Sequence, residues 1–405
     1  MLKIKKAEDT LLFLTLLFLP TQLGKHFWPS FSYIYSLKID YLSPVIYFWD
    51  ILAAGLLAVW FLQKPKINKL ALNLLLVFLF TQALSLIGAG NIGAGLVRLE
   101  QYILAGFFGV YLSSLDFKSL AQKIFLPLAL GILGQALIAI LQFLKGSTIG
   151  FWFLGERTFS ITTPGIAKFD FYGNQFLRPY ATFPLPNVLA GYLVVMVYGL
   201  WFMVYRQKRL LKAVSILAAV IIFLTMSRVA ILAGMVAVLV MLRRQSIKII
   251  ILITIITIIL SPILFIRFSA IFNFDSLTLT RREELIGSAW QIFLKKPFFG
   301  VGLNNFIPVS AGDLLTGPSR FLQPVHNILL LELAETGIIG LMGLLGLIGY
   351  PVLKRSKFKI QNSKLLWVII LFLGMFDHYF LTLPQGYRLL FLIWGLSFSS
   401  SAKTA

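Results

Sequence analysis

Long apolar runs alternate with short polar or basic hinges along the whole chain. Because a bilayer core about 30 Å thick takes about 20 apolar residues per helix, these runs predict about twelve transmembrane helices. The predicted fold is an all-α, polytopic integral membrane protein, with residues 1–405 forming one transmembrane domain. The segments lie at about 10–23, 44–62, 69–88, 98–114, 121–144, 187–205, 211–225, 229–243, 247–268, 326–350, 363–381 and 386–400.

The composition agrees with a membrane protein and excludes several kinds of site. Hydrophobic residues make up 59% of the chain and charged residues only 13%, against roughly a quarter charged residues in soluble domains. The chain has no cysteine and three histidines, which excludes thiolate zinc sites, disulfides and cysteine nucleophiles and disfavours a multi-histidine metal site. The first apolar run ends at Pro20 without a small-x-small cleavage site, so we expect it to be a helix rather than a cleaved signal peptide.

The formal net charge of +21 reflects membrane topology rather than nucleic-acid binding. If alternate loops lie on opposite sides, 21 of the 36 Lys and Arg residues fall on the side of the termini, against three acidic residues. The positive-inside rule then places both termini in the cytoplasm. Two long loops, 145–186 and 269–325, fall on the outer face, while the cytoplasmic loops are short. We therefore expect the chemistry on the outer face.

The first outer loop ends in an arginine and a proline-rich stretch before the sixth apolar segment. Arg178 opens the sequence Arg-Pro-Tyr-Ala-Thr-Phe-Pro-Leu-Pro-Asn, which ends at Asn187. The prolines impose an extended backbone, and Asn187 suits the N-cap of the next helix. A substrate-binding role for Arg178 and a purely structural one are both open, and for Asn187 the structural role is favoured.

Thr225-Met226-Ser227-Arg228 forms a minimal outer turn between two apolar runs. An arginine in such surroundings is costly unless it is paired or faces a polar cavity, which makes Arg228 a candidate functional residue. The alternative is an arginine that only reaches to the membrane interface.

The second outer loop contains an amphipathic helix. Thr280 and Glu283 have capping-box spacing, and Leu285, Ala289, Ile292 and Phe293 share one face, which predicts a helix along the membrane surface. Arg281 and Arg282 would then occupy its first turn, where the helix dipole and guanidinium groups favour phosphate. A solvated charged face is the alternative. The glycines at 300 and 302 that follow predict a tight turn, since the third glycine of a dinucleotide loop is absent.

His326 and Asn327 stand at the start of the tenth segment, and Glu332 and Glu335 lie six and nine residues after His326, two to three turns deeper. The helix dipole favours a neutral imidazole at an N-terminus, the form that accepts a proton, so His326 is a candidate general base. His378, near the outer end of segment eleven, is the second candidate. His26, between aromatic residues, is better interpreted as an interfacial residue.

These motifs, in this order, resemble the O-antigen ligase and O-antigen polymerase superfamily of membrane glycosyltransferases. The resemblance is clearest over residues 178–345. The elements are Pro-Asn before a helix, Ser227-Arg228, an Arg-led helix running into Pro-Phe-Phe-Gly-Val-Gly-Leu-Asn-Asn-Phe, His326-Asn327 and Glu335-x-Gly-x-x-Gly. Leu185 stands where many relatives would have glycine or histidine, which weakens a role for Asn187.

The resemblance implies transfer of a glycan from a polyprenyl (undecaprenyl) diphosphate carrier to an acceptor hydroxyl on the outer face of the cytoplasmic membrane, with no cofactor and no metal. Arg228 and Arg281 or Arg282 would hold the diphosphate, and His326 would take the acceptor proton. Asn327, Glu335 and His378 join Arg178 and Asn187 as candidate substrate-binding residues. Fixed guanidinium groups can stabilise a departing diphosphate without a metal.

Two alternatives remain open. A polymerase would use the growing lipid-linked glycan as acceptor, whereas a ligase would use a lipid-core sugar or a protein hydroxyl. A lipid-linked glycan transporter would place ionisable residues near the midplane and show inverted repeats. We find no convincing repeat, and most intramembrane acids lie toward the outer ends of their segments, which favours the enzyme.

Overall fold

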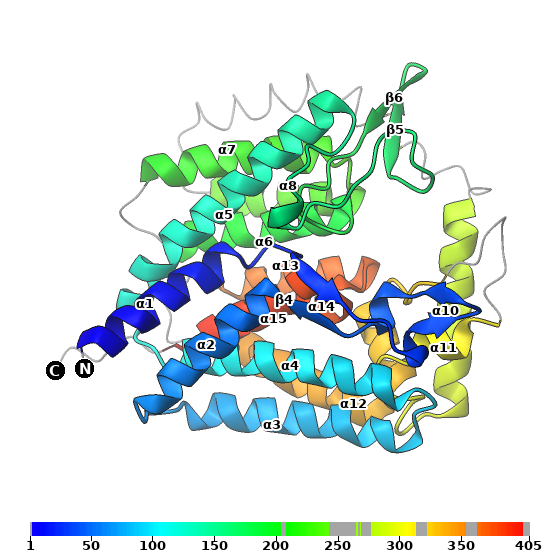
Figure 1. Cartoon of the computed structure of the whole chain (residues 1–405), viewed down its shortest axis with the longest axis horizontal. Helices are drawn as coiled ribbons and strands as arrows, with labels where there is room; N and C mark the ends of the chain where they lie inside the picture. Colours follow the sequence, from blue (N-terminus) through cyan, green and yellow to red (C-terminus); the bar gives the residue numbers. More distant parts are fainter. Residues whose placement is uncertain are drawn as a thin grey trace. The chain divides into compact units, whose positions relative to one another are not determined.

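The computed structural model describes residues 2–203, 208–242, 265, 268, 277–312, 322–353 and 363–399 and is mostly helical (Figure 1). The chain divides into two compact units. Unit 1 comprises residues 1–131 and 280–405, and unit 2 comprises residues 132–279.

Unit 1 contains most of the helices. They are α1 (Leu2–Leu17), α2 (Phe48–Leu62), α3 (Lys69–Leu84), α4 (Ile92–Ser113), the start of α5 (Phe117–Lys145), nearly all of α10 (Leu277–Lys295), α11 (Phe306–Ser310), α12 (Ile328–Leu353), α13 (Ser363–Phe376), α14 (Tyr379–Thr382) and α15 (Pro384–Phe398). Two short antiparallel ribbons join them: β1 (Gly24–His26) with β4 (Val45–Tyr47), and β2 (Tyr33–Ile34) with β3 (Leu37–Lys38).

Unit 2 is built from the rest of α5 with α6 (Pro186–Met203), α7 (Lys208–Leu224) and α8 (Arg228–Leu242). A third ribbon pairs β5 (Lys168–Phe171) with β6 (Asn174–Leu177) (Figure 1). The three ribbons were not predicted, because strands of two to four residues are too short for an alternating pattern.

The predicted segments correspond to helices wherever the structure describes them, but several boundaries were wrong. Segment 247–268 lies almost entirely outside the described residues. The first helix ends at Leu17, before Pro20, rather than at 23. The fourth begins at Ile92 rather than at 98, because the Asn91 side chain accepts a hydrogen bond from Ala94 N at 3.0 Å and caps it. The eleventh ends at Phe376, and α14 follows as a separate turn.

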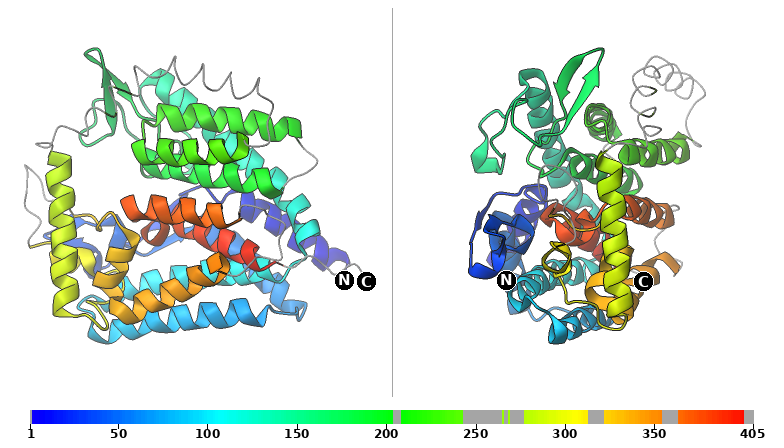
Figure 2. Two further views of the ribbon diagram at one scale, coloured as in Figure 1. Left: turned by 180° about the vertical axis from the view of Figure 1, so that it is seen from behind. Right: turned by 90° about the vertical axis from the view of Figure 1, so that its right-hand side faces the viewer.

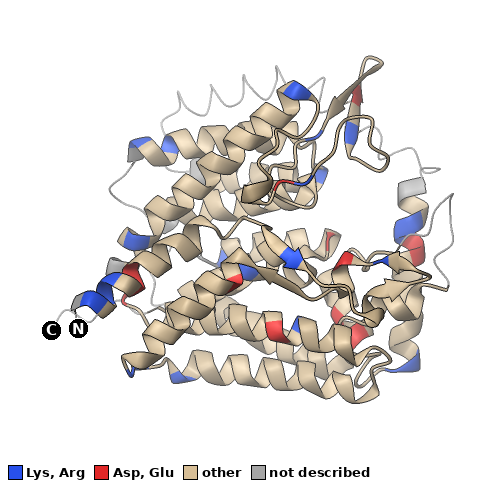
Figure 3. Cartoon of the chain, in the orientation of Figure 1, with Lys and Arg blue, Asp and Glu red and all other residues tan. Residues whose placement is uncertain are grey.

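Twelve membrane spans are not established. Within the described residues, three helices are long and apolar enough to cross a membrane: Lys69–Gly88, Leu120–Lys145 and Ile328–Leu353. Four shorter apolar helices accompany them: Phe48–Leu62, Pro186–Trp201, Arg228–Val240 and Lys364–Phe376. Figure 3 shows how few charged residues interrupt these helices and how the lysines of α1 gather toward its N-terminal end.

Polar contacts in unit 1 bring several predicted cytoplasmic hinges to one end. Lys123 Nζ lies 2.6 Å from Asp9 Oδ1, and Gln63 donates to Glu8 at 2.9 Å. Asn68 N donates to Ser114 Oγ at 3.1 Å. The start of the chain and the hinges at 64–69 and 116–123 therefore lie together, as alternating helices require.

The centre of unit 1 is a group of helices that pack side by side. α3 packs against α12, and α15 packs against α4 and α12 (Figure 2). Within this group, Arg388 is fully buried and lies 3.2 Å from Asp50 Oδ1, with its guanidinium over the rings of Tyr47 and Trp49. Arg388 is therefore neutralised inside the fold and serves to join α15 to α2.

The turn that follows α10 is hydrogen-bonded to α12 at the point where that helix is interrupted. Gly337 has φ +67°, a conformation that favours glycine, and divides α12 into two parts. Beside this break, Gly302 N donates to Glu335 O at 2.7 Å and Ile338 N donates to Pro297 O at 2.8 Å. The predicted tight turn at residues 300–302 is thus held by the backbone of α12 beside its break at Gly337.

Candidate active site

His326, Asp377 and His378 form a cluster in unit 1. One ring nitrogen of each histidine and one carboxylate oxygen of Asp377 all lie within 4.8 Å of one another. His326 immediately precedes Asn327, and Asp377 and His378 form the connection between α13 and α14. The His326 and His378 rings meet edge to face with centroids 5.1 Å apart. The sequence predicted both histidines separately, and the fold brings them together.

The contacts of His378 with Thr382 are the basis for assigning its tautomer. His378 Nδ1 lies 2.6 Å from Thr382 Oγ1, and Thr382 Oγ1 donates to the His378 carbonyl at 3.1 Å. If the single hydroxyl proton of Thr382 is on that carbonyl, the hydroxyl accepts from Nδ1–H, and we assign His378 this tautomer. His378 Nε2 therefore presents a lone pair toward the cluster, where it is buried without a hydrogen bond and lies 4.0 Å from Asp377 Oδ1.

Both histidines are held neutral. Burial lowers the pKa of His326 below its usual 6.5; the Asp377 carboxylate opposes this and the Arg282 charge adds to it. Burial lowers the pKa of His378 much further, reinforced by His326, Arg98 and Arg282. A neutral His326 can accept a proton, and it is only partly buried, whereas His378 is fully enclosed.

The same three groups are of the kinds that ligate metal ions, and their spacing could hold one. The two guanidinium groups whose charges reach the cluster, Arg98 and Arg282, disfavour an added divalent cation. We therefore assign no ion to it, and a metal-free reaction remains a prediction.

Arg281 and Arg282 do not lie where the capping-box pattern put them. α10 already includes Leu277, so Thr280 is inside the helix and both arginines fall in its second turn. The free N–H groups of a first turn are therefore not beside them. The predicted apolar face is confirmed at Leu285, Ala289 and Ile292, which pack into a core with Ile39, Val325 and Leu331. Of the two arginines, Arg282 is the one whose charge acts on both histidines.

Arg98, in α4, is a residue that the sequence did not single out. It is 4% exposed, donates to Gln101 Oε1 at 2.9 Å and lies over the Tyr387 ring, 5.9 Å from its centroid. None of the described carboxylates lies within ion-pair distance of it. The signal available in the sequence was an arginine inside an apolar run, but the predicted segment began at this residue, so Arg98 was placed at the membrane boundary.

The side chains of Asn327 and Glu335 both accept hydrogen bonds from backbone amides. Asn327 Oδ1 accepts from Leu329 N and Leu330 N, both at 3.0 Å, and so caps α12, while its Nδ2 donates to Met375 O at 3.2 Å. The buried carboxylate of Glu335 accepts from Asn304 N at 3.0 Å and Phe306 N at 3.1 Å. These contacts fix His326 and the preceding turn, and direct substrate contact by either residue remains a prediction.

In unit 2, the loop that carries Arg178 meets the turn that precedes Arg228. Arg178 Nε donates to Thr225 O at 2.5 Å. Arg228 is the first residue of α8, with only Met226 and Ser227 between it and Thr225. The split between segments seven and eight is confirmed at this turn. Two of the predicted arginines therefore occupy one corner of unit 2.

This loop is fixed by glutamines that the sequence analysis missed. Gln142 Oε1 accepts from Tyr180 N and Ala181 N at 3.0 and 2.8 Å, and its Nε2 donates to Glu156 Oε1 at 2.7 Å. Gln135, two turns earlier on α5, accepts from Thr182 N at 3.1 Å. Burial alone would raise the pKa of Glu156, but hydrogen bonds from Gln142 and three backbone amides lower it.

Asn187 was predicted as an N-cap, and that prediction was wrong. α6 begins at Pro186, which suits the first position of a helix because proline has no N–H. Asn187 is therefore the second helical residue, and its assignment as a substrate-binding residue stays a prediction.

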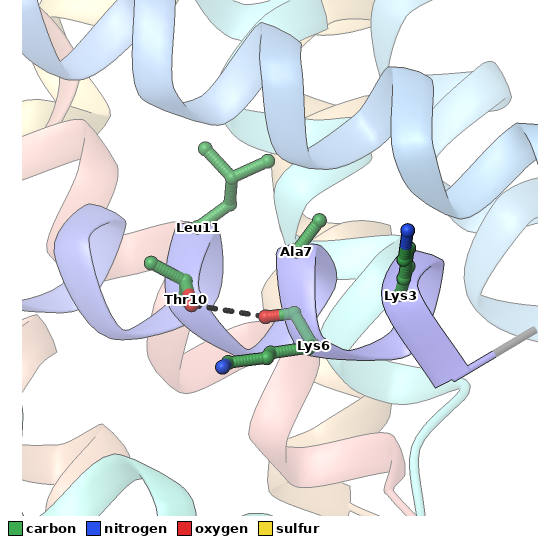
Figure 4. Close-up of a pocket in the computed structure, with 5 residues that line it drawn as sticks. All are labelled: Lys3, Lys6, Ala7, Thr10 and Leu11. Atoms are coloured by element: carbon green, nitrogen blue, oxygen red, sulfur yellow. Dashed lines mark hydrogen bonds between the residues drawn. The ribbon is translucent and has the colours of Figure 1, made fainter.

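A surface hollow along α1 is lined by Lys3, Lys6, Ala7, Thr10 and Leu11 (Figure 4). Thr10 Oγ1 donates back to Lys6 O at 2.9 Å. This lining contains no histidine or carboxylate, so it offers no acid–base pair. The hollow is therefore not the candidate active site.

Part of the chain matches a known protein family. Residues 213–345 match the family model described as O-antigen ligase. No curated protein matches the sequence. The matched segment contains Arg228, Arg281, Arg282, His326 and Glu335, whereas Arg178 and the Asp377–His378 pair lie outside it. Together with the apolar helices, the match supports a multi-pass membrane protein with ligase- or polymerase-type activity. The predicted resemblance to the O-antigen ligase superfamily is thus confirmed over residues 213–345.

Proposed function

We propose that the protein transfers a glycan from a polyprenyl diphosphate carrier to an acceptor hydroxyl at the outer face of the cytoplasmic membrane, as an O-antigen ligase-type glycosyltransferase. The observation that carries the proposal is His326, a neutral, partly buried imidazole beside a second histidine and a carboxylate, within the segment that matches the family. A histidine of this kind is suited to remove a proton from an alcohol.

In the proposed reaction, the acceptor oxygen attacks the anomeric carbon of the donor while its proton passes to a ring nitrogen of His326. The bond between the anomeric carbon and the phosphate oxygen breaks, and its electron pair leaves with the polyprenyl diphosphate. The products are the glycosylated acceptor, the free carrier and a protonated His326, which releases its proton to water.

Guanidinium groups would stabilise the departing diphosphate. We assign this role to Arg228, supported by Arg178 in the same corner of unit 2, and to Arg282 rather than Arg281 in unit 1. Arg282 is preferred because its charge acts at the histidine cluster. Bidentate arginine–phosphate pairs supply charge and orientation without a metal.

The acceptor class follows from the product. A ligase transfers the glycan to a different molecule, and a polymerase extends the lipid-linked glycan itself. No described residue favours one of them, so the assay must offer both kinds of acceptor.

The test is to follow a radiolabelled undecaprenyl diphosphate oligosaccharide incubated with the purified protein in liposomes. We expect wild-type protein to move label to an added acceptor or into longer lipid-linked chains, and His326→Ala to lower the rate by about 10²- to 10⁴-fold. His26→Ala is the matched control, since His26 lies in the β1–β4 ribbon, where it bonds Ser43 and stacks on Trp28. Label that only changes leaflet would favour the transporter instead.

A further inference from the structure

Two acceptor atoms converge beside His326 in the histidine cluster. One is the Asp377 carboxylate and the other is Nε2 of His378, which carries the lone pair in the tautomer assigned from the Thr382 contacts. They lie 4.0 Å apart, and His378 Nε2 makes no hydrogen bond. Two hydrogen-bond acceptors at this distance do not stabilise each other. A third group that carries a proton or a positive charge would stabilise both.

The backbone holds this pair in place. Asp377 Oδ1 accepts from His378 N at 2.8 Å, and the Tyr41 ring packs edge to face on His378 at 5.6 Å. Asn327 Nδ2 donates to Met375 O, which ties the residue after His326 to the segment just before Asp377. The cluster is thus built from the ends of α12, α13 and α14 in fixed relation.

We propose that Asp377 and His378 are positioning residues for His326, stabilising and orienting the imidazolium that forms when His326 takes the acceptor proton. This inference rests on the proposed function, since it needs His326 to be the base. Asp377 supplies the compensating charge, and His378 Nε2 supplies a neutral acceptor for the His326 N–H. Thr382 keeps His378 in the tautomer that has this lone pair.

Charged and titratable groups approach the cluster from several elements. Asp377 and His378 come from the α13–α14 connection, Arg282 from α10, Arg98 from α4 and Tyr41 from the turn before β4. The Arg282 charge opposes protonation of His326, the Arg98 charge acts on His378, and Asp377 is the anion that favours protonation of His326. Removing the Asp377 charge therefore leaves the protonated state of His326 without its compensating anion.

The experiment measures proton binding by His326 separately from glycan transfer. Diethyl pyrocarbonate acylates neutral imidazole, and in a His26→Ala background the enclosed His378 leaves His326 as the accessible histidine. The rate of modification against pH in liposomes then gives the His326 midpoint. We expect Asp377→Asn to move this midpoint down by about 1 pH unit and to lower kcat by about 10-fold, with KM for the lipid-linked donor unchanged.

Thr382 provides the second test. Thr382→Val removes the hydroxyl that fixes the His378 tautomer and should lower kcat, while Thr382→Ser should restore it. Asp170→Asn is the control, because Asp170 is an exposed residue of β5, where its side chain accepts a hydrogen bond from Gly173 N in the β5–β6 turn. If Asp377→Asn fails to fold, the Val and Ser variants still decide the proposal.

The outcomes separate the inference from the proposed function. An unchanged midpoint and kcat in Asp377→Asn, or equal rates in Thr382→Val and Thr382→Ser, would overturn the inference while wild-type transfer stands. Wild-type protein that transfers no glycan would refute the proposed function, whatever the midpoint does. Loss of activity in a chelator, restored by zinc, would make the cluster a metal site and overturn the positioning role.

Discussion

His326 and His378 are 52 positions apart in the sequence, yet their rings meet edge to face at 5.1 Å. Only one of them is placed to react. His378 is fully enclosed and bound to Thr382, whereas His326 is partly exposed at the start of α12. The contact therefore joins a reactive histidine to a supporting one.

The acid limb of the pH–rate profile should lie below pH 6.5. His326 must be neutral to act as a base, and its lowered pKa keeps it neutral to lower pH than an ordinary histidine. Because the Arg282 charge contributes to this lowering, Arg282→Gln should raise the His326 pKa and move the limb to higher pH. The pH dependence of kcat for each purified protein checks this. An unchanged acid limb in Arg282→Gln would show that the Arg282 charge does not act on His326.

Arg228→Ala should lower transfer by about 10²- to 10³-fold, as loss of one donor to a developing anion does elsewhere. Arg228→Lys keeps the charge but not the bidentate geometry, so its transfer rate should lie between those of wild type and Arg228→Ala. Arg157→Gln, in the same unit, serves as a control for the loss of one positive charge. Equal rates in the Ala and Gln variants would contradict the assignment.

Gln142→Ala should loosen the loop that carries Arg178. The change leaves the amides of Tyr180 and Ala181 without their acceptor, at a cost of about 1–3 kcal/mol each. We expect a lower melting temperature and a reduced kcat. Gln175→Ala, on the exposed end of the β5–β6 ribbon, should change neither. A stable but inactive Gln142→Ala protein would point to direct substrate contact instead.

Glu335→Ala should destabilise the protein rather than only weaken substrate binding. Its carboxylate satisfies two buried amides, and their loss costs about 2–6 kcal/mol. Glu335→Gln retains one acceptor oxygen, so its stability should lie between those of wild type and Glu335→Ala. Thermal unfolding in detergent measures the effect, with the exposed Glu100→Gln as control. Normal stability with an increased KM in Glu335→Ala would restore the substrate-binding role predicted from the sequence.

Treatment with EDTA should leave glycan transfer unchanged. The proposed reaction uses arginines for the diphosphate and a histidine for the proton, and the Arg98 and Arg282 charges disfavour a cation at the histidines. Transfer rates before and after dialysis against the chelator test this. Activity that is lost and then recovered with magnesium or zinc would show that the metal-free mechanism is wrong.

The sequence by itself was sufficient for features that depend on local pattern. Apolar runs located the helices, because burial of an apolar segment needs no knowledge of its neighbours. The Thr225–Ser227 turn, the apolar face of Leu285, Ala289 and Ile292, and the histidine at the start of α12 were all predicted in this way. The family resemblance rested on the same local motifs, and the match over residues 213–345 confirms it.

Tertiary structure decided which of these local features meet. Nothing in the spacing of His326 and Asp377 shows that the ends of α12 and α13 are adjacent, since side-chain contacts across a helix bundle depend on packing. The roles of Asn327 and Glu335 as backbone caps, the glutamines that hold the Arg178 loop and the burial of Arg98 also arise from contacts between distant segments. From the sequence, a polar side chain is only a candidate for binding a substrate. The fold determines whether its polar atoms are already hydrogen-bonded to the backbone.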